Sequence, residues 1–216
     1  MKALLFPGQG VQKVGMIDFL LETNPETKNL LTQTSDVLDF DLFELVKNGP
    51  ENKLNLTEYA QPAILAASLA IAKNKASYFN ASITAGLSLG EYSALVFAEC
   101  IEFKEAIRLV NARGKLMQNA VPEGTAGMLV VLNMPLPDVR ETIIKIRNSG
   151  EVIDFSTDNA EGVSVLAGTN SAINATIKYI EEGDFQKRWS LLNLSFFQDF
   201  VSLGLRRSVY NIISVS

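Results

Sequence analysis

The sequence predicts an α/β fold, with a larger unit built on a parallel sheet and a small α+β unit after it. A turn rich in glycine and serine joins a β-rich run, residues 81–85, to a helix-forming run, residues 91–97. The alanine-rich run 57–78 is apolar on nearly every face, which is typical of a buried helix. After Pro122 the pattern changes to short strands and helices. Together these observations indicate two units of different architecture.

The first unit begins with a strand over Lys2–Phe6 and a glycine-rich loop at Pro7–Gly10. Capping and breaker residues then set the expected helices. These are a helix with Asn24 as N-cap and Pro25 at its first position, ending near Leu38; one from Asp41 to Val46, stopped by Gly49-Pro50; one from Thr57 or Gln61 to about Tyr78, with Pro62 in its first turn; and one over Phe103–Gln118.

The second unit has the order β-α-β-β-α, which suggests a split βαβ, ferredoxin-like insert. Its strands are expected at 127–132, 151–156 and 163–167, and its helices at 136–147 and 171–182. Asp158, Asn159 and Glu161 fall in the turn between the two inner strands, where hairpin-turn chemistry explains them. The rest, 183–216, has no lasting period, although Val209–Val215 is long enough for a short helix or strand. The expected divisions are 1–122, an incomplete larger subdomain; 123–187, the small subdomain; and 188–216, a divergent tail.

Composition excludes several classes of function. The net charge of −5 and the isoelectric point near 4.9 leave no basic footprint for nucleic acid. A single cysteine, no signal-peptide pattern and no run of 18 apolar residues predict a cytoplasmic chain without a membrane partner. The sequence holds no histidine, so it offers neither a His-ligated metal site nor an imidazole base, and no metal is expected.

The turn itself reads Gly86-x-Ser88-x-Gly90, the spacing of a nucleophile elbow. Glycine allows a sharp strand-to-helix turn, which would present Ser88 at a helix N-terminus, where backbone N–H groups favour a developing anion. The alternative is an ordinary turn in which the Ser88 side chain is an N-cap.

Arg113 is the second candidate. In the helix over Phe103–Gln118 it falls inside the arc that carries most of the apolar side chains. A guanidinium on such a face requires acceptors. Three alternatives follow. Arg113 makes a structural buried ion pair, or its aliphatic part lies along the apolar surface while the guanidinium reaches solvent, or it lines a pocket and binds a carboxylate in bidentate fashion.

Three segments carry a family resemblance: Phe6-Pro7-Gly8-Gln9-Gly10, Gly86-Leu87-Ser88-Leu89-Gly90-Glu91-Tyr92 and Arg113-Gly114-Lys115-Leu116-Met117-Gln118. Their order and spacing resemble those of malonyl-CoA:acyl carrier protein transacylases, the acyltransferases of bacterial fatty acid synthesis. Tyr59-Ala60-Gln61-Pro62-Ala63 and Ala120-Val121-Pro122-Glu123-Gly124 resemble family segments as well.

The resemblance implies a hydrolase-like α/β core with a ferredoxin-like insert. It implies malonyl transfer from malonyl-CoA to acyl carrier protein through a malonyl ester of Ser88, with no cofactor beyond the coenzyme A thioester and the carrier's phosphopantetheine. The implied oxyanion hole consists of the backbone N–H groups of Gln9 and Leu89. Arg113 would pair with the malonyl carboxylate, and Asn159 would be a weaker substrate contact.

The chain also departs from the family. Leu87 stands where many members have histidine, Val11 replaces a common serine, and the segment comparable to the one bearing the family's base, Asn193–Gln198, has no histidine. The chain is therefore expected to follow the family to about Lys187 and then to become unrelated sequence, as a shifted reading frame or truncated gene model would produce. Without its base the transacylase is expected to be impaired. A G-x-S-x-G thioesterase or esterase, and a non-catalytic acyl-CoA or carrier-protein binding fragment, are the alternatives.

Overall fold

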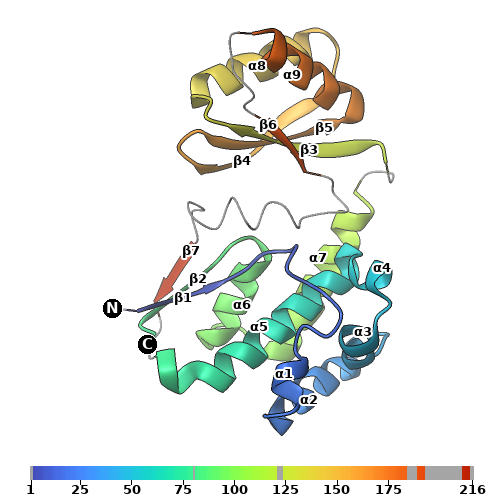
Figure 1. Ribbon diagram of the computed structural model, residues 1–216, viewed down its shortest axis with the longest axis vertical. Coiled ribbons are helices and arrows are strands. Elements are labelled where there is room, and N and C mark those ends of the chain that lie inside the picture. Colours follow the sequence, from blue (N-terminus) through green and yellow to red (C-terminus); the bar gives the residue numbers. More distant parts are fainter. Residues whose placement is uncertain (1, 80, 121–123, 184–188, 193–210, 215–216) are drawn as a thin grey trace. The chain divides into compact units, whose positions relative to one another are not determined.

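The structure is a computed structural model, which describes residues 2–79, 81–120, 124–183, 189–192 and 211–214. The chain forms two compact units (Figure 1). One comprises Met1–Ala120 with Tyr210–Ser216, and the other comprises Val121–Val209.

The first unit is a three-stranded sheet with helices. Its elements are β1 (Ala3–Phe6), α1 (Asp18–Leu21), α2 (Pro25–Thr32), the 3₁₀ turn η1 (Gln33–Asp36), α3 (Leu42–Asn48), α4 (Glu51–Leu54), α5 (Thr57–Phe79), β2 (Ile83–Gly86), α6 (Leu89–Phe97), α7 (Phe103–Gln118) and β7 (Asn211–Ser214). The strand order is β1-β2-β7, and β1 and β2 are parallel, with Leu5 opposite Ala85. Such a pair needs a long crossover, which the five helices between them provide. Because β7 runs antiparallel to β2, the sheet is mixed, whereas the sequence predicted a parallel one.

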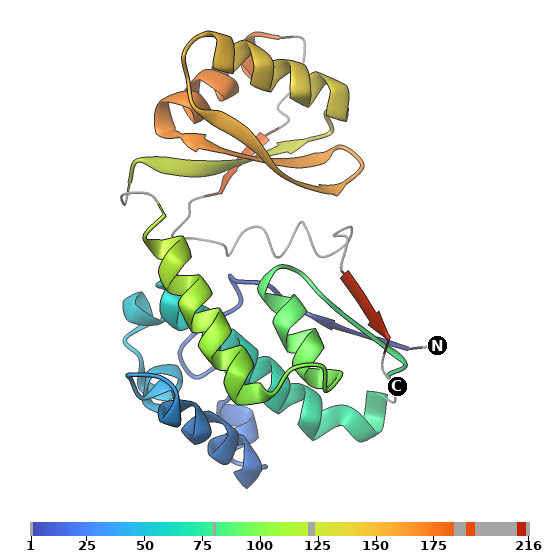
Figure 2. The ribbon, with the colours of Figure 1, turned by 180° about the vertical axis from the view of Figure 1, so that it is seen from behind.

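Helix α5 is the centre of the first unit's core. Its alanine-rich face is fully buried against residues of α2, α3, α6 and α7, as the sequence predicted. Figure 2 shows α7 lying along α5. Although α5 has 23 residues, neither it nor any other helix in the described part of the chain is long and apolar enough to cross a membrane.

Pro62 lies deeper in α5 than predicted. The helix begins at Thr57, so Pro62 is beyond the first turn, where a proline leaves the carbonyl four residues earlier without its N–H donor. That carbonyl belongs to Glu58, and it accepts a hydrogen bond from Asn111 Nδ2 of α7 at 3.0 Å. The side chain of a neighbouring helix thus compensates for the missing backbone donor.

The helical pattern of Phe103–Gln118 predicts Asn111 on the polar side of α7 and Leu116 and Met117 on the apolar side. Asn111 is instead buried, because it makes this hydrogen bond to Glu58 O, and Leu116 and Met117 are 74% and 43% exposed. Elsewhere the expected Asn24 cap is confirmed, because Asn24 accepts from Glu26 N at 2.9 Å. Asp41, expected to open its helix, is the N-cap of α3 and accepts from Glu44 N at 3.0 Å. The helix predicted to reach Leu38 ends at Thr32, because the chain tightens into η1.

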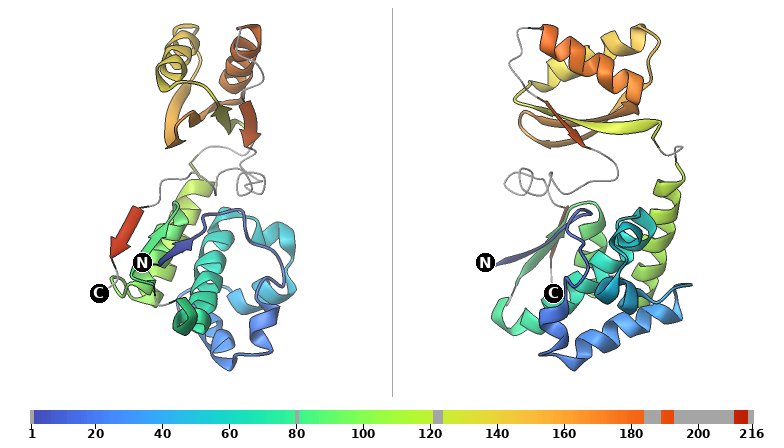
Figure 3. Two further views of the ribbon diagram at one scale, coloured as in Figure 1. Left: turned by 60° about the vertical axis from the view of Figure 1, so that its left-hand side comes forward. Right: turned by 45° about the vertical axis from the view of Figure 1, so that its right-hand side comes forward.

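The second unit is a four-stranded antiparallel sheet with two helices on one face (Figure 3). Its elements are β3 (Ala126–Leu132), α8 (Leu136–Asn148), β4 (Ile153–Ala160), β5 (Val163–Thr169), α9 (Asn170–Glu182) and β6 (Trp189–Leu192). The strand order is β4-β5-β3-β6. The central strand β5 runs antiparallel to both of its neighbours, β3 and β4, which therefore run in the same direction. Leu129 and Leu166 of the sheet and Ile173 of α9 belong to a core of its own.

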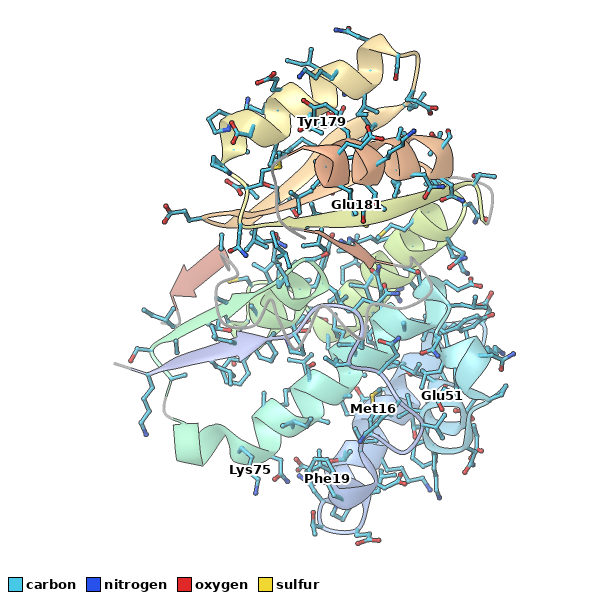
Figure 4. All side chains as sticks on the ribbon, turned by 45° about the horizontal axis from the view of Figure 1, so that its top comes forward. Met16, Phe19, Glu51, Lys75, Tyr179 and Glu181 are labelled. Atoms are coloured by element: carbon cyan, nitrogen blue, oxygen red, sulfur yellow. The ribbon has the colours of Figure 1, made fainter. Side chains whose placement is uncertain are left out.

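Contacts at the surface join the two helices of this unit. Lys145 Nζ of α8 donates to the Tyr179 hydroxyl of α9 at 2.5 Å, and Tyr179 and Glu181 lie along α9 in Figure 4.

In the first unit, the same view shows Phe19 of α1, whose side chain is 56% exposed.

The range 188–216, which the sequence analysis separated as a tail, contributes a strand to each unit. β6 pairs with β3, and β7 pairs with β2. Each of these strands has only four residues, which is too short to display a lasting period. The predictions for residues 121–123, 184–188 and 193–210 lie outside the described residues.

Candidate active site

Ser88 lies between β2 and α6 in a strained backbone conformation. Its φ of 54° and ψ of −105° fall in a region that residues with a side chain rarely adopt. The flanking glycines are required sterically: a Cβ on Gly86 would overlap the Gly90 carbonyl, and one on Gly90 would overlap the Phe6 carbonyl. The packing of three backbone segments therefore explains the G-x-S-x-G spacing.

The Ser88 side chain does not cap the helix. Ser88 is the N-cap residue of α6 by position, but its hydroxyl makes no capping hydrogen bond, and the residue is exposed. The alternative of a structural N-cap is thus wrong. Leu89 is the first residue of α6, so its N–H has no carbonyl one turn earlier and points out of the helix start, beside Ser88.

Arg113 of α7 reaches this serine. Its Nη2 donates to Ser88 Oγ at 2.7 Å, and its Nη1 donates to Gln61 Oε1 at 2.9 Å. The guanidinium carbon also lies 5.9 Å from the centre of the Tyr92 ring, within the range of a cation–π contact. Within the described residues Arg113 forms no ion pair, so the expected alternative of a buried ion pair is wrong there.

Gln61 is a residue of this site that the sequence analysis did not single out. It is 1% exposed, and its Nε2 lies 3.3 Å from Met117 Sδ, so both ends of the carboxamide have partners. A buried amide needs such partners, because desolvation without them costs free energy. A glutamine near the start of an otherwise apolar helix was the available signal.

A close crossing of α5 and α7 fixes the backbone position of Arg113. A Cβ on Gly114 would stand only 2.7 Å from Glu58 Cα and from Thr57 O, so α7 meets the start of α5 at backbone contact distance. Asn111 adds its hydrogen bond to Glu58 O at the same crossing. Arg113 lies between these two residues, so its Cα is held in place at this crossing.

The loop after β1 lies against the elbow. Leu87 N donates to Phe6 O at 3.3 Å, and a Cβ on Gly8 would be 3.0 Å from Leu87 O. Gln9, half-buried in this loop, donates from Nε2 to Thr57 Oγ1 at 3.3 Å. The structure thus brings Gln9, Ser88, Leu89 and Arg113 into one unit, from three segments of the chain.

Asn159 belongs to the second unit. The sequence placed it in a turn, but β4 continues to Ala160 and the turn is formed by Glu161 and Gly162. Asn159 falls at a register shift between β4 and β5, where Asp158 and Ala160 have partners in the ladder. Such bulges redirect a side chain at a strand end.

Comparison with known proteins decides the family. A model of the acyl transferase domain matches residues 3–201 of the chain. The chain belongs to the acyl transferase domain family. The range matched by the family includes the elbow, the Arg113 helix, all of the small unit's described strands and 14 residues beyond Lys187.

The relatives of this acyl transferase domain are named as malonyl transacylases. The chain is 43% identical over 186 residues to the malonyl CoA-acyl carrier protein transacylase of Haemophilus influenzae, and the match covers 83% of this chain and 58% of that protein. A crystal structure of the Clostridium perfringens transacylase matches with a TM-score of 0.82 at 33% identity, covering 98% of this chain and 70% of that one.

A further structure, PlMCAT:AntF, contains a type II PKS acyl-carrier protein in complex with its malonyl-transacylase. It matches with a TM-score of 0.80 at 37% identity, covering 97% of this chain and 71% of that chain. The acyl transferase domain described here thus spans between 58% and 71% of the length of these relatives.

Proposed function

We propose that this chain transfers a malonyl group from malonyl-CoA to acyl carrier protein through an ester of Ser88. The observation that carries the proposal is the 2.7 Å bond between Arg113 Nη2 and Ser88 Oγ. A guanidinium beside a nucleophile attracts an acyl group that ends in a carboxylate, as malonyl does and acetyl does not. A thioesterase that hydrolyses uncharged acyl groups does not require this cation.

In the first half-reaction Ser88 Oγ attacks the thioester carbonyl of malonyl-CoA. The new C–O bond forms, the C–S bond breaks, and the coenzyme A thiol leaves with a proton. We assign the backbone N–H groups of Gln9 and Leu89 to the oxyanion, and Arg113, held by Gln61, to the malonyl carboxylate. No imidazole within these 216 residues can take the Ser88 proton, because the sequence contains no histidine.

In the second half-reaction the phosphopantetheine thiol of a carrier protein attacks the malonyl ester and releases Ser88. Asn159 is assigned, more weakly, to substrate contact in this scheme. The complex of a related transacylase with its carrier protein supports a carrier protein as acceptor.

The same proposal extends to the fold. We infer a hydrolase-like core in the first unit, supported by the parallel β1–β2 pair and the strained turn at Ser88. We infer a ferredoxin-like small subdomain, supported by the strand order β4-β5-β3-β6 with two helices on one face. The proposed division is 1–122 and 123–187, with 188–216 as a tail that adds β6 to the small subdomain and β7 to the larger one.

Intact-protein mass spectrometry after incubation with malonyl-CoA tests the function. We expect a malonyl adduct on wild-type protein, none on Ser88→Ala, and loss of the adduct when phosphopantetheinylated carrier protein is added. Acylation is expected to be slow, since losing the base of a hydrolase unit costs about 10⁴- to 10⁶-fold in kcat. The incubation is therefore run with and without added imidazole.

The competing functions give different results in the same experiment. Hydrolysis of malonyl-CoA with no carrier-protein transfer would indicate a thioesterase. Binding of malonyl-CoA without an adduct, with imidazole present, would indicate a non-catalytic binding fragment. An adduct that persists in Ser88→Ala would remove the nucleophile assignment.

A further inference from the structure

Gln12 is a buried side chain with two well-placed hydrogen bonds and no role in the scheme above. It is 7% exposed. Its Oε1 accepts from Gly10 N at 2.8 Å, and its Nε2 donates to Asn55 Oδ1 at 3.0 Å. Leaving a buried carboxamide half-paired costs about 1–3 kcal/mol, so both bonds resist rearrangement.

The partner of Gln12 lies two residues from the partner of Gln9. Asn55 follows α4, and Thr57, which accepts from Gln9 Nε2 at 3.3 Å, begins α5. The loop after β1 is therefore tied twice to the α4–α5 junction, at its residues 9 and 12. The Gly10 backbone between them has φ of 116°, which an L side chain rarely adopts.

The bond to Gly10 fixes a particular peptide plane. The N–H that Gln12 holds belongs to the peptide joining Gln9 to Gly10, and the N–H of Gln9 belongs to the peptide immediately before it. The two planes are linked through φ and ψ of Gln9, and the loop is tied at Gln9 and at Gln12, so a rotation of the 9–10 plane has to be taken up by the plane before it. Holding Gly10 N consequently limits where the Gln9 N–H can point.

We propose that Gln12 is a positioning residue for the oxyanion hole, acting through the 9–10 peptide to aim the Gln9 N–H at the reacting carbonyl. The inference rests on the proposed function, because it takes the Gln9 N–H as an oxyanion donor. Gln12 itself touches no substrate in this scheme. An oxyanion donor is worth 10²- to 10³-fold in kcat, so a misdirected one is expected to lose part of that factor.

The test compares Gln12→Met, Gln12→Glu and Gln118→Met in the full chain. Methionine keeps the volume of Gln12 but makes neither bond. Glutamate keeps the acceptor for Gly10 N, and Asn55 can turn its amide to donate to it. Gln118→Met is the matched control, because Gln118 Oε1 accepts from Thr57 N at 3.2 Å at the same junction but lies at the surface.

We expect Gln12→Met to slow Ser88 acylation by malonyl-CoA by about 10- to 100-fold at saturation, with the half-saturating concentration within about twofold of wild type. Gln12→Glu should restore most of the rate, and Gln118→Met should match wild type. A Gln12→Met protein that acylates at the wild-type rate, or loses only affinity, would overturn the inference.

A second measurement does not depend on catalysis. Hydrogen exchange of the Gly10 amide is expected to be faster in Gln12→Met by at least about tenfold and unchanged in Gln118→Met, as judged by peptide-level mass spectrometry. Unchanged exchange would show that Gln12 does not hold the loop, whatever the rates. If the wild-type chain forms no malonyl ester, the proposed function fails and the catalytic role of Gln12 fails with it, while the exchange result still decides whether the loop is held.

Discussion

At the scale of single residues, the candidate site depends on glycines that have no room for a side chain. A Cβ on Gly90 would meet backbone atoms of Phe6 and Pro7, which cannot rotate away. We expect Gly90→Ala to lower the free energy of unfolding by about 3 kcal/mol or more, despite the better helix propensity of alanine. Urea unfolding followed by circular dichroism measures this.

The control for this prediction is Gly127→Ala. A Cβ there would meet Ile173 Cδ1 at 3.1 Å and Asn170 Oδ1 at 3.5 Å, both at the ends of side chains. It should change the free energy of unfolding by less than about 1 kcal/mol. Equal losses in the two variants would contradict the steric account of the elbow.

Arg113 carries the second residue-scale prediction. Arg113→Ala removes a charge-assisted contact worth about 1.5–3 kcal/mol, so the malonyl acylation rate should fall by about 10- to 100-fold relative to the acetyl rate. Arg113→Lys keeps the charge but loses the planar fork, and an intermediate ratio is expected. Parallel acylation rates with malonyl-CoA and acetyl-CoA measure the ratio.

Arg108→Ala is the matched control on the same helix. Arg108 is exposed and pairs with Glu105 at 3.3 Å, so its loss should leave the ratio unchanged. If Arg113→Ala slowed acetyl and malonyl transfer equally, Arg113 would serve to position Ser88 and not to select the acyl group.

The sequence pointed to Ser88 and Arg113 because both break a local pattern. Ser88 stands between glycines at a strand-to-helix boundary, and Arg113 is a cation among apolar neighbours. Gln61 gives only a weak signal, as a polar residue near the start of an otherwise apolar helix, and Asn111 gives none, because it falls among the polar residues of its own helix. Their importance comes from partners about 50 residues away, Arg113 and the Glu58 carbonyl, which only the fold brings together.

At the scale of elements, the crossing of α5 and α7 determines the position of Arg113. A methyl group on Gly114 would press on Glu58 Cα and Thr57 O, both backbone atoms at 2.7 Å. Gly114→Ala should therefore lower the melting temperature, since an overpacking cost of about 1–3 kcal/mol exceeds the roughly 1 kcal/mol that alanine gains in a helix. The malonyl acylation rate should fall as well.

Leu116→Ala, at a 74% exposed position of the same helix, is the control and should change the free energy of unfolding by no more than about 0.5 kcal/mol. A higher melting temperature for Gly114→Ala would mean that helix propensity, and not the close crossing, governs this position.

Element boundaries followed from the sequence where the signal was local. Asn24 caps its helix as predicted, Asp41 marks the start of α3, and α7 has the predicted bounds, Phe103–Gln118. Pro62 was misplaced because its helix begins earlier than a proline usually allows. The cost of that proline is offset by Asn111 from α7, which is a tertiary effect and leaves no trace within α5 itself.

At the scale of the whole molecule, the chain has two separate cores. The second unit's core is formed by residues between Leu129 and Ile180, all within that unit. The first unit is instead completed by β7, from the far end of the chain. The order of elements in the second unit was predictable from its local patterns, whereas the strands β6 and β7 depend on pairing partners about 60 and 130 residues away and were not.

We therefore expect a fragment of residues 124–192 to fold alone, since it contains all four strands and both helices of the second unit. At roughly 70 residues it is small, so its stability should be modest but its unfolding cooperative. Leu166→Ala, which empties a fully buried position in the fragment, should cost about 2–5 kcal/mol, and Val152→Ala, at a 69% exposed position, less than about 0.5. Thermal unfolding by circular dichroism measures both. A fragment that melts without a cooperative transition, or responds equally to the two substitutions, would mean that this core requires the rest of the chain.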